Sequence, residues 1–88
     1  MSIYNQKLIQ TINSTIHYFF PEVKHISVEK YDNEIIVEFN HNKNQKFRKN
    51  ILENAKSKKL RDIKKALIHE LISLKRKEDG NYASIHKS

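Results

Sequence analysis

The 88-residue sequence has no cysteine and no tryptophan, and it has only one glycine and one proline. Without cysteine it can form no disulfide, no thiolate metal site and no iron–sulfur cluster, and it has no cysteine nucleophile. A single glycine excludes the glycine-rich loops that cradle phosphates. No apolar run approaches the roughly 18 residues of a membrane span, and residues 1–10 lack the apolar core of a secretory signal. We therefore expect a cytoplasmic protein that needs no cofactor or metal and does not contact a membrane.

Length and composition limit the chain to one domain with a modest core. At 38% hydrophobic residues the sequence lies near the lower end for a packed domain. We place the compact domain at residues 1–80 and a tail or short added strand at residues 81–88. Lysine far outnumbers arginine, at 14 against 3, and isoleucine and asparagine are abundant. This bias is typical of an AT-rich genome, such as that of a phage or mobile element, and says nothing of mechanism.

Positive charge is concentrated in the second half of the sequence. The formal net charge is +7, but residues 1–40 carry three lysines against five acids. Residues 43–65 alone carry ten lysines and arginines against Glu53 and Asp62. Such asymmetry between halves indicates a polyanionic partner.

The first half of the sequence predicts a helix and a β-hairpin. Apolar side chains recur every three or four residues over residues 3–19, and Pro21 ends the pattern; they are Tyr4, Leu8, Ile12, Ile16 and Phe19. Residues 24–40 read as a hairpin with a two-residue turn at Asp32–Asn33, since both residue types tolerate positive φ. That turn places Val28 opposite Val37 and Ile26 opposite Phe39 on one face. The other face carries Glu29, Glu34 and Glu38 and should be acidic.

Helical spacing resumes after residue 44, with Phe47, Ile51 and Ala55 and then a second stripe from Leu60 to Leu74. We predict helices at residues 45–56 and 58–77, with Ser57 as the N-cap of the second, and one long bent helix as the alternative. Asp79–Gly80 should end the helix. Residues 82–85 could add a third strand to the hairpin. The expected fold class is α+β, in the order α-β-β-α-α, with helices packed on a small antiparallel sheet.

The basic residues of the second half form the first candidate site. On a helical projection, Lys58, Lys65, His69 and Arg76 lie opposite the apolar stripe, and Arg61 lies beside them. With four cations upstream they would form a positive ridge for phosphate groups; those four are Arg48, Lys49, Lys56 and Lys59. The shortage of arginine favours contact with backbone or shape over bidentate base reading. The competing interpretation is a solvated face that only keeps the protein soluble.

A second candidate surface is the flank of the last helix. Ile68 and Ile72 widen its apolar stripe, so the first helix covers them or they form a dimer or partner interface. Base stacking on aromatic residues is disfavoured, because the basic segment contains only Phe47 and the open hairpin face is acidic.

The five histidines do not have zinc-ligand spacing. His25 and His41 could approach each other at the open end of the hairpin, which allows the hypothesis of a metal-free ribonuclease. Their ordinary interpretation is a pair of exposed residues at strand ends.

The leading hypothesis is therefore a small non-catalytic regulatory protein that binds nucleic-acid backbone through its C-terminal helices. A first alternative is an inhibitor that occupies the nucleic-acid channel or acidic cleft of a host or defence enzyme, as anti-CRISPR-like proteins do. A second alternative is a small homodimeric structural protein that uses Ile68 and Ile72 as its contact.

Overall fold

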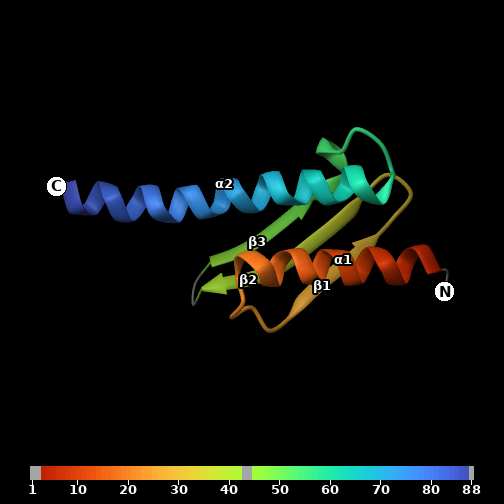
Figure 1. The fold of residues 1–88 in the computed structure, drawn as a ribbon, viewed down its shortest axis with the longest axis horizontal. Helices are drawn as coiled ribbons and strands as arrows, with labels where there is room; N and C mark the ends of the chain where they lie inside the picture. The colour runs from red at the N-terminus through yellow and green to blue at the C-terminus, as the bar shows by residue number, and fades with distance from the viewer. Residues whose placement is uncertain (1–2, 43–44, 88) are drawn as a thin grey trace.

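The fold consists of a three-stranded antiparallel sheet with two helices on one of its faces (Figure 1). A computed structural model of the chain describes residues 3–42 and 45–87. The elements are α1 (Ile3–Phe19), β1 (Ile26–Lys30), β2 (Ile35–Asn42), β3 (Gln45–Asn50), the 3₁₀ turn η1 (Ile51–Asn54) and α2 (Leu60–Lys87). The sheet order is β1-β2-β3, and α1 packs beside α2. The predicted α+β class, with helices packed on an antiparallel hairpin, is confirmed.

Helix α1 has the predicted bounds. Leu8, Ile12 and Ile16 are buried, as the spacing indicates, while the side chain of Tyr4 lies outside the described part. The loop that follows is fixed by a contact at 2.8 Å between His17 Nε2 and the carbonyl oxygen of Val23. The helix itself ends at Phe19, two residues before Pro21, as the sequence predicts.

The register of the β1–β2 hairpin is also as predicted. Ile26 pairs with Phe39 and Val28 with Val37. The turn is closed by the Tyr31 amide, which donates to the Glu34 carbonyl at 2.8 Å. The position of the turn at Asp32–Asn33 is right, but no non-glycine residue in the described part has positive φ. The turn thus does not use the left-handed backbone that these residue types tolerate.

The predicted helix at residues 45–56 is wrong. Residues 45–50 form the edge strand β3, and residues 51–54 form the turn η1. In β3 the side chains alternate: Phe47 is buried opposite Phe39, while Arg48 lies opposite Glu38 on the other face. The pairing satisfies the backbone of the β2 edge that β1 leaves open, and this tertiary gain overrides the helical spacing. A third strand therefore exists, but it comes from this segment.

Helix α2 is longer than predicted and begins later. It runs from Leu60 to Lys87, so residues 45–77 are neither two helices nor one bent helix. Asp79–Gly80 does not end it, because a glycine inside a helix costs only about 1 kcal/mol relative to alanine. Residues 82–85, predicted as a tail or strand, lie within α2. The first carbonyl that accepts hydrogen bonds within the helix is that of Lys59, which accepts from the Asp62 and Ile63 amides. Ser57 is therefore not the N-cap.

The core lies between the helices and the inner face of the sheet. At its centre Phe39 stacks on Phe47, with ring centroids 4.8 Å apart, and Phe20 packs against Phe39 at 5.9 Å. The buried apolar set also includes residues from both helices, β2 and η1, among them Leu8, Ile12, Ile16, Val37, Ile51, Ile63, Leu67 and Leu71. Phe47 is thus the side chain through which β3 joins the core.

Replacing Phe47 with alanine should destabilise the protein by about 3–5 kcal/mol, because it removes the stacked ring and leaves a cavity. Chemical denaturation followed by circular dichroism measures this loss. Lys46→Ala, one position away on the open face, is the control and should cost about 0.5 kcal/mol or less. Equal costs for the two variants would contradict the assignment of Phe47 to the core face.

Candidate nucleic-acid interface

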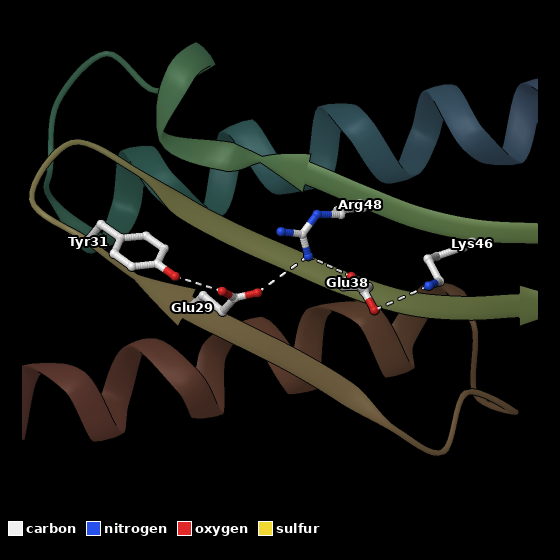
Figure 2. A network of polar contacts seen from close by, with 5 residues as sticks. All are labelled: Glu29, Tyr31, Glu38, Lys46 and Arg48. Carbon is white, nitrogen blue, oxygen red and sulfur yellow. Dashed lines mark hydrogen bonds and ion pairs between the residues drawn. The ribbon is translucent and has the colours of Figure 1, made fainter.

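The outer face of the sheet carries an ion-pair network that crosses all three strands (Figure 2). Arg48 Nη1 donates to Glu38 Oε1 at 2.6 Å and to Glu29 Oε2 at 3.3 Å. Lys46 Nζ lies 3.7 Å from Glu38 Oε2, and the Tyr31 hydroxyl donates to Glu29 Oε1 at 2.7 Å. The hairpin face that the sequence predicts to be acidic is therefore largely neutralised by cations from β3.

These contacts shift the ionisation of the network. The Arg48 guanidinium holds the pKa of Glu38 below its ordinary value, and the two glutamates raise the pKa of Arg48. The hydrogen bond to Glu29 raises the pKa of the Tyr31 hydroxyl. The Arg48 guanidinium thus forms ion pairs with two carboxylates of the protein itself. Lys49 reaches toward α2, where its ammonium lies 3.9 Å from Glu70 Oε1. Neither residue joins the predicted positive ridge.

A different set of cations gathers where α2 begins. We call Lys56, Lys59, Arg61 and Lys65 the basic cluster; all four are exposed. Lys56, Arg61 and Lys65 line one open groove with Asp62, and Lys59, Arg61 and Lys65 each act electrostatically on that carboxylate. In the part of the chain that the structure describes, no carboxylate oxygen lies within 4.0 Å of any cluster cation. Three of the four cluster cations therefore act on one acid, and the fourth, Lys56, lines the same groove.

The segment before α2 is held in place by side-chain hydrogen bonds. The Ser57 hydroxyl donates to Asp62 Oδ2 at 2.5 Å and accepts from the Lys59 amide at 3.1 Å. The pKa of Asp62 is lowered, first by the Ser57 hydroxyl and then by the neighbouring cations, against the opposing effect of burial. Lys58 donates to the Asp32 carbonyl at 2.7 Å and so ties this segment to the β1–β2 turn. The cluster is therefore presented on a fixed backbone.

The remaining predicted site residues lie further along α2. His69 lines the same groove as the cluster, together with Ile68. Arg76 is exposed but lies about 16 Å beyond Lys65 along the helix axis. Ile68 and Ile72 are half-buried, so they are neither fully covered by α1 nor fully exposed. The predicted ridge is thus concentrated at its N-terminal end.

The structure also brings together residues that the sequence does not connect. Lys7 and Gln10 of α1 share a groove with Leu60 and Lys64 of α2. Lys64 also lines a neighbouring hollow with Tyr18 of α1. Lys64 could be found from the charge of segment 43–65, but nothing in the sequence places α1 beside it.

The two histidines of the ribonuclease hypothesis lie in different environments, so the interpretation of both as exposed strand-end residues is wrong for His41. His41 is buried and packs against Phe20 and Phe39, whereas His25 is exposed. No three His, Asp or Glu side chains in residues 3–42 and 45–87 are grouped so as to hold a metal ion. None of the helices described has the length and apolar content that crossing a bilayer requires.

Comparisons with protein-family models, curated proteins and solved structures return no match.

The lowered pKa of Glu38 makes the sheet network sensitive to acid. A carboxyl group whose pKa is lower in the folded state stabilises the fold above its unfolded pKa, here about 4.5. That contribution is lost as the pH falls through the folded value. We expect Glu38→Gln to lose less stability than the wild type between pH 7 and pH 3 in urea titrations.

The matched control is Glu22→Gln, which removes an exposed carboxylate outside the network. It should retain the acid sensitivity of the wild type. If Glu38→Gln and the wild type lose the same stability on acidification, the network does not contribute to the pH dependence.

Proposed function

We propose that this protein is a small non-catalytic binder of nucleic acid, and that the basic cluster at the start of α2 contacts the phosphate backbone. The observation that carries the proposal is the division of the positive charge. The cations of β3 are bound to the protein's own glutamates, whereas Lys56, Lys59, Arg61 and Lys65 are exposed without a close carboxylate in the described chain. Charge that is not used within the fold is available to a polyanion.

The arrangement suits phosphate better than a base edge. Three of the four cluster cations are lysines, whose ammonium groups act as point charges and tolerate many phosphate positions. The positive end of the α2 dipole adds a modest attraction for anions in the same place. Asp62 is the one acid among them, and its bond to Ser57 holds it against the backbone segment. We therefore infer binding that depends little on sequence and strongly on salt.

Four phosphate contacts would lower the affinity for duplex DNA roughly 100-fold between about 50 mM and 200 mM salt. Replacing three of the cluster cations by alanine, Lys59→Ala with Arg61→Ala and Lys65→Ala, should weaken binding at low salt. It should also reduce the slope of log affinity against log salt by about 3, because each lost phosphate contact removes nearly one released counterion. Fluorescence anisotropy with labelled DNA and RNA duplexes measures both quantities.

The matched control loses the same charge elsewhere, through Lys24→Ala, Lys46→Ala and Lys77→Ala. This variant should keep most of the salt slope, because none of these residues belongs to the cluster. Equal effects of the two triple variants would show that only net charge matters and would contradict the proposed site. If neither DNA nor RNA binds at low salt, nucleic-acid binding is refuted, and an acidic protein surface becomes the partner to test.

A further inference from the structure

Tyr18 is the most exposed large hydrophobic side chain in the described chain, with 81% of its surface accessible, against 51% for Tyr31 and 37% for Ile9. Its ring is nonetheless supported. It meets Phe19 edge to face, with centroids 5.3 Å apart and planes at 82°. Tyr31, by contrast, uses its hydroxyl in the sheet network. Among the described residues, Tyr18 makes no hydrogen bond. An aromatic face that is left in water is suited to stacking with another π system.

Tyr18 borders a hollow between α1 and α2, the two helices that lie together on the inner face of the sheet (Figure 1). Its apolar lining comes from Phe19 and Ile68, both half-buried. The Thr15 hydroxyl at its edge already donates to the Thr11 carbonyl at 2.7 Å. The volume of the hollow is about 360 Å³, within the usual range for a small-molecule site. It therefore offers a largely apolar slot beside an exposed ring.

Lys64 connects this hollow to the charged surface. Its side chain lines the hollow and also the adjacent groove, where Lys7 and Gln10 contribute from α1. The next residue along α2 is Lys65, a member of the basic cluster. If the phosphates of a nucleic-acid strand contact Lys64 and the basic cluster, the neighbouring bases lie close to Tyr18. An ammonium next to an aromatic face is the combination that single-strand binding sites use.

We propose that the hollow beside Tyr18 accepts an unpaired nucleobase of the nucleic acid whose backbone lies on the basic cluster. This inference rests on the proposed function. It narrows the ligand class to nucleic acids that have at least one unpaired nucleotide next to the stretch whose backbone contacts the basic cluster. Every base has a π face, so stacking on Tyr18 requires no particular base. Charge complementarity to phosphate at Lys64 and Lys7 selects a nucleotide over an uncharged apolar ligand.

The test compares a blunt hairpin with the same hairpin carrying a short single-stranded 3′ overhang, in DNA and RNA versions. The overhang contains 2-aminopurine, whose fluorescence falls when it stacks. For the 88-residue chain we expect about tenfold tighter binding to the overhang substrate and a fall in 2-aminopurine fluorescence. Tyr18→Ala should remove both effects and leave the affinity for the blunt hairpin unchanged. Tyr18→Phe should retain them.

Tyr31→Ala is the matched control, since it removes an exposed tyrosine from the opposite face of the sheet, and it should behave as the wild type. Salt-dependent binding of both hairpins with no gain from the overhang would overturn this inference and leave the proposed function intact. Loss of blunt-hairpin affinity in Tyr18→Ala, with the folded circular dichroism spectrum retained, would overturn the stacking role. If the wild type binds neither hairpin at low salt, the proposed function fails as well.

Discussion

The pairing of β3 with β2 determines both the core and the charge layout of this protein. One face of β3 brings Phe47 onto Phe39, which completes the apolar layer beneath the helices. The other face brings Arg48 across from Glu38 and within reach of Glu29. Since side chains alternate along a strand, a single register fixes both sets of contacts. Hydrophobic burial and charge pairing therefore favour the same alignment and stabilise it together.

This register also divides the basic half of the sequence into two populations. Cations of β3 lie opposite acidic residues of β1, β2 or α2, where their fields are largely cancelled. The basic cluster at the start of α2 faces solvent, and three of its members, Lys59, Arg61 and Lys65, act electrostatically on Asp62. A net charge calculated from sequence adds these populations together, although only one of them produces a strong field outside the molecule. The candidate interface is accordingly smaller than the charge of residues 43–65 suggests, and its members lie closer together.

The sequence predicted the elements whose signal is local and redundant. Helix α1 has a long apolar stripe ended by Pro21, and the β1–β2 register aligns four apolar side chains at once. The segment of β3 has no such redundancy, because Phe47 and Ile51 satisfy the spacing of a helix as well as that of a strand followed by a turn. Only the unpaired edge of β2 decides between them, and that is a tertiary constraint. For the candidate site, the sequence indicates the cations after residue 55, and their role stays a prediction; it does not indicate the pairing of Arg48 with Glu29 and Glu38.

The neighbourhood of Tyr18 and Lys64 illustrates what spacing alone cannot supply. The two residues are far apart in sequence and belong to different helices, and they line one hollow only because α1 and α2 pack beside each other on the sheet. From the sequence, base stacking is disfavoured because the basic segment contains only Phe47 and the open hairpin face is acidic. Tyr18 lies outside that segment, on α1, and helix packing places it beside Lys64 at one hollow. Under the proposed function, this packing would add an aromatic contact to an otherwise electrostatic surface, and such a contact would distinguish nucleic acids with unpaired nucleotides from blunt duplexes.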